Sequence, residues 1–485
     1  MAYTLDDTIC AVSTPAGVGG IAVIRVSGQD AINICDSIWN GRSLNDVESH
    51  TAHLGEIVDK EINDGAIDQC VATVFRGPKS YTGEDTVELA VHGSRWVQRE
   101  VLALLQRSGC RMAEPGEYTR RAVVNGRLDL AQAEGVADVI ASTSRAAHRI
   151  ALRQMKGGIS QKLSELREQL LQLAVLLELE LDFSEEDVEF ADRKRLIEIA
   201  KSIREELQRL YQSFSRGNAI KEGIPVAIIG ATNAGKSSLL NALLDDERAI
   251  VSDIHGTTRD TIEETLEIGD YLFRFIDTAG LRDTSDPIER IGIDRSRKAI
   301  GRARLIIVMM DITDKSNYDA VTVGNIKSIL PDEISNHLDG DGALDVIIGL
   351  NKMDVLSESE RLKITDALPR MKEQLSEGFH IQPISVKNTS GLRELRELIE
   401  RIATENDDTA GDGTDIMITN LRQAEALRQA LDAISPLIEG LETGLETDLV
   451  AQHLRETLST LSSVTGTIPT TEILNTIFSS FCIGK

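Results

Sequence analysis

The most restrictive feature of this 485-residue chain is a loop of the pattern G-x-x-x-x-G-K-S at residues 230–237. The apolar run Val226 to Ile229 precedes the loop, and a helical pattern from Ser238 to Leu244 follows it. A strand, such a loop and a helix in that order bind phosphate, because the glycines let backbone N–H groups face the anion at a helix N-terminus. Lys236 can then reach the β- and γ-phosphates, and the Ser237 hydroxyl can bind Mg²⁺.

Further motifs indicate that the nucleotide is a guanine nucleotide. Asp277-Thr278-Ala279-Gly280 follows the apolar run Leu272 to Ile276, which places an aspartate near Mg²⁺ and a glycine N–H near the γ-phosphate. Asn351-Lys352-Met353-Asp354 follows Val346 to Leu350, and the Asp354 carboxylate can accept hydrogen bonds from guanine N1–H and N2–H₂. Adenine lacks both donors, and the unpaired charge would cost about 1–3 kcal/mol or more. Ser385-Val386-Lys387, after a further strand, is predicted to lie behind the base.

Composition places the chain among multidomain proteins of the cytosol. Its length exceeds that of one ordinary domain, and its N-terminal stretch, Met1 to Thr8, is polar and acidic, unlike a secretion signal. No apolar run is long enough to cross a bilayer. The histidines and cysteines show no metal-ligand spacing, and the odd number of cysteines favours reduced thiols, at positions 10, 35, 70, 110 and 482. We therefore expect a cytoplasmic protein with no membrane segment and no metal bound by histidine or cysteine.

The charge distribution argues against a protein that simply coats nucleic acid, because the net charge is −26. A local basic face is nevertheless present, since four cationic residues recur at helical spacing: Arg145, Arg149, Arg153 and Lys156. Two interpretations of this face stay open, a contact with a phosphate backbone and an ordinary solvated surface.

The pattern of the chain predicts a multidomain protein in four segments. Residues 1–126 mix short β-type runs with turns, as in an α+β domain. Residues 127–222 and 403–485 are helical, and 223–402 alternate strands with helices as in an α/β domain built on a parallel sheet. The first helical segment carries an apolar stripe at residues 163, 166, 170, 173 and 177. Neither helical segment closes a core alone, so we expect one bundle into which the nucleotide domain is inserted.

Motifs outside the nucleotide domain closely resemble the MnmE (TrmE) family of tRNA-modifying GTPases over nearly the whole chain. They are Thr14-Pro15-Ala16-Gly17 followed by Gly19 to Arg25, Ser80 to Leu89 followed by His92-Gly93, Pro115 to Ala122 followed by Asn125 to Glu134, and the C-terminal Phe481-Cys482-Ile483-Gly484-Lys485.

This resemblance implies that the N-terminal domain binds 5-formyltetrahydrofolate or a related tetrahydrofolate and forms a homodimer. The folate positions of the family correspond to Arg25, Glu88, Arg127 and Lys485. Some relatives carry Lys where this chain has Arg127, which keeps the charge but presents a planar fork. From the residues alone, Arg25 can equally be a surface arginine at a strand end, and Glu88 a buried carboxylate paired with an arginine.

The resemblance also implies a reaction and a partner. With the flavoprotein MnmG, in a heterotetramer, family members add an aminomethyl or carboxymethylaminomethyl group at C5 of the wobble uridine (position 34) of certain tRNAs. Cys482 is then a candidate catalytic thiol, and the neighbouring Lys485 would raise its thiolate fraction. The alternative is an inert, buried thiol at the end of the chain.

Hydrolysis of GTP is expected to depend on a carboxylate and on potassium. Position 281 is Leu281, which cannot orient water as the glutamine of Ras-type enzymes does. The family pattern assigns that role to Glu289. It assigns Mg²⁺ to Ser237 and Thr258, and K⁺ to Asn233, Ser252, Ile254 and Thr257, in place of an arginine finger. Arg259 is the alternative finger.

The nucleotide motifs and the family resemblance together imply the complete set of expected GTP-binding residues. It comprises Asn233, Ala234, Gly235, Lys236, Ser237, Ser238, Ser252, Asp253, Ile254, His255, Gly256, Thr257, Thr258, Asp277, Thr278, Ala279, Gly280, Asn351, Lys352, Asp354, Ser385, Val386 and Lys387.

Two rival functions share the central motifs. A ribosome-assembly GTPase of the Era/Der type predicts a basic RNA-binding domain after the nucleotide domain, where this chain has an acidic stretch and helical periodicity. A slow regulatory switch or scaffold gives no reason for Cys482 or for the folate-type residues.

Overall fold

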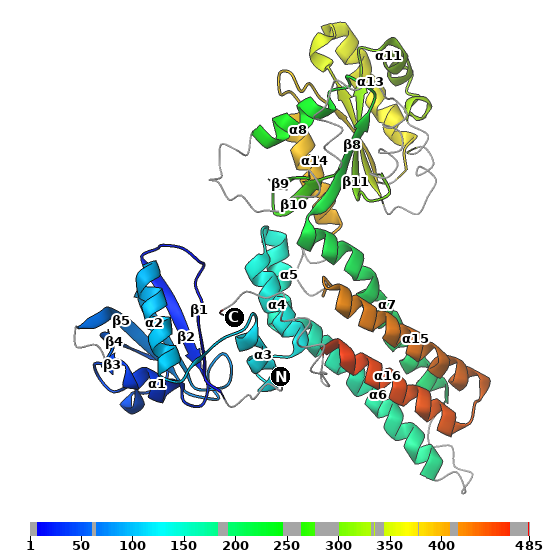
Figure 1. The fold of residues 1–485 in the computed structure, drawn as a ribbon. Coiled ribbons are helices and arrows are strands. Elements are labelled where there is room, and N and C mark those ends of the chain that lie inside the picture. The colour runs from blue at the N-terminus through cyan, green and yellow to red at the C-terminus, as the bar shows by residue number, and fades with distance from the viewer. Residues whose placement is uncertain are drawn as a thin grey trace. The chain divides into compact units, whose positions relative to one another are not determined.

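The computed structural model describes residues 7–60, 65–182, 193–245, 263–276, 300–330, 334, 344–376, 378–407, 416–465 and 484 (Figure 1). Two compact units emerge from the contacts between residues. The first combines Met1–Ile140, Leu152–Gln208 and Glu425–Lys485, and the second combines Ala141–Ala151 with Arg209–Ala424. Each unit is therefore built from segments that are distant in sequence. The predicted boundaries at 126, 222 and 402 remain predictions.

The N-terminal part of the first unit is a seven-stranded sheet in the order β3-β4-β5-β6-β2-β1-β7. Its strands are β1 (Ile9–Val12), β2 (Ile21–Ser27), β3 (Trp39–Asn40), β4 (Thr51–Val58), β5 (Ala66–Phe75), β6 (Thr86–His92) and β7 (Arg111–Met112). Alternate residues of the long strands point to one face, where α1 (Ala31–Ser37) and α2 (Arg95–Arg107) complete a buried core. The β-type runs expected in this segment are confirmed. The face opposite this core, called the open face below, is covered in part by Tyr118 and Tyr81 beside Ile9 and Ala11.

Helices form the rest of the first unit. They are α3 (Glu117–Val124), α4 (Leu130–Ala141), α6 (Gly158–Asp182), most of α7 (Arg193–Glu222), most of α15 (Leu421–Thr443), and α16 (Thr447–Thr465). The predicted leucine stripe on α6 is buried at all five positions, and α6 packs along α16 (Figure 1). Lys201 of α7 pairs with Glu442 of α15 over 2.6 Å. The two helical segments therefore pack together, as expected.

The second unit contains a six-stranded sheet in the order β13-β12-β11-β8-β10-β9. The strands are β8 (Ile224–Gly230), β9 (Glu264–Ile268), β10 (Tyr271–Phe275), β11 (Leu305–Asp311), β12 (Asp345–Asn351) and β13 (Phe379–Pro383). All pairings are parallel except that of β9 with β10. Parallel strands covered on both faces are apolar throughout, as β11 is in Leu-Ile-Ile-Val-Met-Met.

Helices cover both faces of this sheet. One core joins it to α8 (Lys236–Asp245) and α14 (Leu392–Glu405), and a second core joins it to α11 (Lys315–Thr322) and α13 (Glu358–Glu373) (Figure 1). Short 3₁₀ turns lie at Leu44–Asp46, Ile326–Ile329 and Met353–Val355. The predicted α/β domain, a mostly parallel sheet with helices on both faces, is present.

Helix α5 (Arg145–Met155) begins in the second unit, which was not expected from its place in the sequence. Ala146 and Ile150 belong to the core of the nucleotide unit, and the Ala146 N–H donates to the Asp270 carbonyl over 2.9 Å. Arg149 pairs with Asp407. Neither interpretation of the basic face describes Arg149, because its charge is directed into the protein.

Within the described ranges, no helix is long and apolar enough to cross a bilayer. The same part of the chain contains no group of three or more histidine, cysteine or carboxylate side chains arranged to hold a metal.

Candidate functional site

The phosphate loop connects β8 to α8 at the carboxyl edge of the parallel sheet, where ligands of such sheets bind. Gly230 has φ 145°, and a Cβ there would lie 2.2 Å from the Met309 carbonyl oxygen. Gly235 has φ 100°, and a Cβ there would lie 2.3 Å from Nδ2 of Asn351. Only glycine fits at either position, so backbone N–H groups stay accessible to an anion.

Lys236 is the first residue of α8 and folds back over the loop. Its Nζ donates to the carbonyl oxygens of Gly230 and Ala231 over 2.8 and 2.9 Å. Burial lowers the pKa of Lys236, since a desolvated ammonium is disfavoured. A phosphate in the loop would offset that desolvation, which suits this lysine to an anionic ligand.

Asn351 ties the phosphate loop to the base motifs. The residue is 3 % exposed. Its side-chain Nδ2 donates to the Ala234 carbonyl over 2.8 Å, and its Oδ1 accepts from the Val386 N–H over 3.2 Å. Three segments predicted separately therefore meet at one edge of the sheet.

Asp354 is held by Ser385, which lies in the Ser385-Val386-Lys387 segment. The Ser385 hydroxyl donates to Oδ1 of Asp354 over 2.6 Å. This bond holds the pKa of Asp354 below its usual range, with Lys387 and Arg361 adding to the effect. The carboxylate is therefore ionised and oriented, as an acceptor for two guanine donors must be.

The remaining nucleotide and metal positions lie outside the described residues. They are Ser252, Asp253, Ile254, His255, Gly256, Thr257, Thr258, Asp277, Thr278, Ala279, Gly280 and Glu289. The strands that lead to them, β9 and β10, are described and pair in register from Tyr271↔Ile268 to Phe275↔Glu264.

One residue at this edge was missed from the sequence. Asp311 ends β11, and its Oδ2 lies 2.5 Å from Nζ of Lys352. The available signal was its position, because a carboxylate directly after the apolar run Leu305 to Met310 must lie at the same edge as the other motifs.

The predicted folate residues Arg25 and Glu88 meet on the open face of the N-terminal sheet. They are opposite one another on β2 and β6, and Nε of Arg25 donates to Oε1 of Glu88 over 2.9 Å. The guanidinium also lies 5.4 and 5.6 Å from the ring centroids of Tyr81 and Tyr118. The pair is only partly buried, at 19 % and 28 % side-chain exposure, so its polar edge can reach a ligand.

The other folate-type positions are less completely described. Arg127 packs on the turn at Gly83, where a Cβ would lie 3.1 Å from its Cγ. Gly484 lies against β1 and has φ 99°; a Cβ at this position would clash with the Val12 carbonyl oxygen. The Gly484 carbonyl accepts a hydrogen bond from the Ser13 hydroxyl over 3.0 Å. Cys482 and Lys485 lie outside the described residues.

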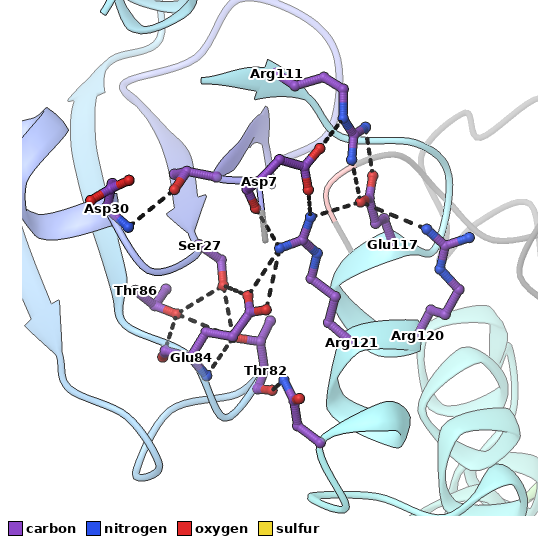
Figure 2. Close-up of polar contacts among 12 residues, drawn as sticks. Asp7, Ser27, Asp30, Thr82, Glu84, Thr86, Arg111, Glu117, Arg120 and Arg121 are labelled. Carbon is purple, nitrogen blue, oxygen red and sulfur yellow. Dashed lines mark hydrogen bonds and ion pairs between the residues drawn. The ribbon is translucent and has the colours of Figure 1, made fainter. Parts of the chain in front are cut away.

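A partly buried cluster of charged side chains holds the loop that carries Glu84 (Figure 2). At its centre Arg121, 1 % exposed, bonds to Asp7, Glu84 and Glu117. Arg111 binds Asp7 and Glu117 over 2.6 Å each. The cluster joins the N-terminal segment, the loop between β5 and β6, and α3. Tyr118 of the same helix donates its hydroxyl to the Arg25 carbonyl over 2.7 Å, so the cluster also fixes the surroundings of Arg25.

The class of protein follows from the nucleotide unit: a phosphate loop, a guanine-type base motif and a mostly parallel sheet covered on both faces define a P-loop GTPase. Family models of the "GTP-binding protein TrmE N-terminus" and the "MnmE helical domain" match residues 8–127 and 130–482. The chain belongs to the MnmE family, and it is a GTP hydrolase.

Curated relatives agree over the full length of the chain. A protein named "tRNA modification GTPase MnmE" from Parabacteroides distasonis is 50 % identical over 484 residues, 99 % of this chain and 100 % of its own. One of the same name from Flavobacterium johnsoniae is 46 % identical over 99 % of both chains. Among solved structures, a GTP-binding protein from Sulfolobus solfataricus in complex with GDP aligns with 50 % of this chain and 68 % of its own, at 20 % identity and a TM-score of 0.26.

Proposed function

We propose that this chain hydrolyses GTP in the cytoplasm as part of the modification of tRNA. The observation that carries the nucleotide assignment is Asn351, which joins the phosphate loop at Ala234 to the base loop at Val386. The relatives named as tRNA modification GTPases support the tRNA substrate. Membership in their family over the whole chain favours this function over the Era/Der alternative.

The residues of the nucleotide unit have separate tasks in this proposal. Lys236 Nζ would release the carbonyls of Gly230 and Ala231 and bind the β- and γ-phosphates instead. Asp354 would accept hydrogen bonds from the two guanine donors. Ser237 and Thr258 would hold Mg²⁺, which neutralises phosphate charge. Asn233, Ser252, Ile254 and Thr257 would hold K⁺ where other GTPases use an arginine. Glu289 would orient the attacking water, because Leu281 cannot.

The proposed tRNA chemistry requires a second enzyme. With the flavoprotein MnmG, this chain would add an aminomethyl or carboxymethylaminomethyl group at C5 of the wobble uridine. Cys482 is the proposed thiol of this step. The position of Gly484 supports this role. Gly484 contacts Val12 and Ser13, and Val12 follows Ala11, which is paired with Arg25 between β1 and β2. The end of the chain is therefore close to the proposed folate residue Arg25.

The open face of the N-terminal sheet supports the proposed tetrahydrofolate site and homodimer. Arg25 and Glu88 lie there, as donors and acceptors for a pterin-type ligand, with Arg127 and Lys485 as proposed further contacts. Three apolar side chains on or beside this face are exposed, Ile21 at 69 %, Leu54 at 68 % and Val71 at 37 %. Leu54 and Val71 are opposite one another on β4 and β5, and exposed apolar surface of this kind favours association.

The deciding experiment is an analysis of modified nucleosides in tRNA from a strain that lacks this protein. We expect loss of the C5-modified wobble uridine, with recovery when the full chain is supplied. In parallel, the purified chain should hydrolyse GTP and leave ATP untouched. Unaltered wobble uridine in the deletion strain would exclude the tRNA function, while hydrolysis of both nucleotides would exclude the base assignment.

A further inference from the structure

Asp311 lies where three nucleotide-binding segments meet. It is the last residue of β11 and is paired in register with Asn351, the last residue of β12. The next residue, Ile312, donates its N–H to the Asn351 carbonyl over 3.1 Å. The backbone of Asp311 is therefore fixed relative to the residue that bridges the phosphate and base loops.

Both oxygens of the Asp311 carboxylate are occupied. Oδ2 accepts from Nζ of Lys352 over 2.5 Å, and Oδ1 accepts from the N–H and the hydroxyl of Thr313 over 3.0 and 2.6 Å. Burial raises the pKa of Asp311, but the hydrogen bonds from Lys352 and Thr313 lower it by more than burial raises it. The pKa of Asp311 therefore lies below its usual range. Three hydrogen bonds therefore hold the carboxylate in one direction, in its ionised form at neutral pH.

Lys352 has an unusual backbone conformation at the point where its side chain contacts Asp311. Its φ and ψ are 67° and 30°, the left-handed region that side chains other than glycine, asparagine and aspartate seldom enter. Such conformations persist at functional sites where the surroundings impose them. Here Asn351 fixes the preceding residue and Asp311 fixes the far end of the lysine side chain.

The Asp311–Lys352 pair is partly open to solvent, which limits its contribution to folding. The two side chains retain 24 % and 34 % of their accessible surface, and exposed ion pairs stabilise proteins little. The left-handed backbone of Lys352 is unfavourable, and its ion pair with Asp311 stabilises the fold little. Together these observations indicate that Asp311 positions Lys352 rather than stabilising the sheet.

We propose that Asp311 is a positioning residue for the guanine nucleotide. It holds the Lys352 side chain beside Asn351, so that its aliphatic stem is already in place to cover the bound nucleoside. Because binding then costs less side-chain ordering, affinity rises. Asp311 acts through Lys352 on every purine nucleotide alike, whereas Asp354 selects the base. The inference rests on the proposed nucleotide site.

The test measures dissociation constants of the full chain for GDP and inosine diphosphate, which lacks the 2-amino group. Asp311→Asn should weaken GDP binding about tenfold. Lys352→Gln should weaken it by a similar factor, and the double variant should lose no more than about twofold beyond Lys352→Gln alone. Asp311→Asn should weaken inosine diphosphate by the same factor as GDP.

Asp314→Asn is the matched control. Asp314 lies three residues further on and caps α11 through the Ser316 N–H over 2.9 Å, a role that asparagine fills equally well. This variant should bind GDP like the wild type. A melting temperature measured without nucleotide should be the same for Asp311→Asn and the control.

Three results would overturn the proposal. They are wild-type affinity in Asp311→Asn, additive losses in the double variant, and unequal factors for the two diphosphates. Failure of the wild-type chain to prefer GDP over ADP would instead count against the assignment of Asp354. The effect of Asp311→Asn is separate, because it compares the dissociation constants of variant and wild type for the same nucleotide.

Discussion

The guanidinium of Arg149 in α5 binds the carboxylate of Asp407, a residue 258 positions later that follows α14. The Asp407 side chain is fully buried, and the Tyr271 hydroxyl donates to the same carboxylate over 2.9 Å. Burial, with the neighbouring Asp407 charge, raises the pKa of Tyr271 to about 12, so the phenol remains a donor at neutral pH. One arginine thus satisfies a buried charge and holds α5 in the nucleotide unit.

Replacing Arg149 should destabilise that unit strongly. Arg149→Met removes the guanidinium that pairs with the buried Asp407 carboxylate, and loss of one partner of a buried ion pair costs about 3–5 kcal/mol of unfolding free energy. Arg145→Met is the control, since Arg145 is 79 % exposed and 3.4 Å from Asp270, and should cost less than about 1 kcal/mol. Urea unfolding measures both, and equal losses would contradict the role of Arg149.

Base preference should depend on Asp354. In Asp354→Asn the amide donates where the carboxylate accepted, so the protein should bind xanthine nucleotides, whose C2 oxygen accepts, and lose affinity for GTP. Ser385→Ala keeps the acceptor and should weaken GTP binding without altering the preference. Competition between GTP and XTP measures the change, and an unchanged ratio in Asp354→Asn would exclude this residue.

Potassium should accelerate hydrolysis. Asn233 in the phosphate loop is a proposed K⁺ ligand, and Leu281 leaves no glutamine to align the water. The rate in KCl should exceed that in NaCl at matched ionic strength by about 10³-fold or more, by analogy with an arginine finger. Glu289→Ala should bind GTP normally and lose most turnover. Equal rates in the two salts would contradict the proposed K⁺ site.

Cys482 should serve the tRNA reaction and not hydrolysis. Cys482→Ser keeps the size of the side chain and removes most of its nucleophilicity. We expect this variant to hydrolyse GTP like the wild type in K⁺ and to leave the wobble uridine unmodified in a deletion strain. Cys35→Ser, at a fully buried thiol in the N-terminal core, controls for general loss of a cysteine. Normal modification by Cys482→Ser would make this thiol structural.

Acid should weaken the N-terminal domain through the Arg121 cluster. Burial raises the carboxyl pKa of Asp7 and of Glu117, but the bonds from Arg111 and Arg121 lower each pKa by more than burial raises it. Both pKa values therefore lie below their usual range. Their stabilisation is therefore complete above the unfolded pKa values, about 3.9 and 4.3, and is lost as pH falls through the lower folded values.

The measurement uses tryptophan fluorescence of the full chain in urea. Both tryptophans, Trp39 and Trp96, lie in this domain, so the signal reports it alone. The midpoint should fall steeply below about pH 4, and Glu117→Gln should flatten that slope. Glu100→Gln alters an exposed pair and should leave the slope unchanged; a flat wild-type profile would exclude the cluster as its cause.

The sequence by itself determined the local elements and their order at the nucleotide site. The glycines of the phosphate loop, the apolar runs before Asp277 and Asn351, and the leucine stripe of α6 each encode their structure over a few consecutive turns or strand residues. Once the strands are parallel, their carboxyl ends must share one edge. The meeting of Asn351, Asp354 and Ser385 could therefore be predicted without coordinates.

Only the tertiary structure decided which distant charges meet. Arg149 sits in a helical segment whose spacing describes a surface face, yet it binds Asp407 because α5 packs on the hairpin between β9 and β10. Asp311 and Lys352 pair because β11 and β12 are neighbours in a sheet order that the chain order does not dictate. Helical and strand periodicity specifies which face of an element is buried, whereas the partner of a buried charge depends on the docking of whole elements.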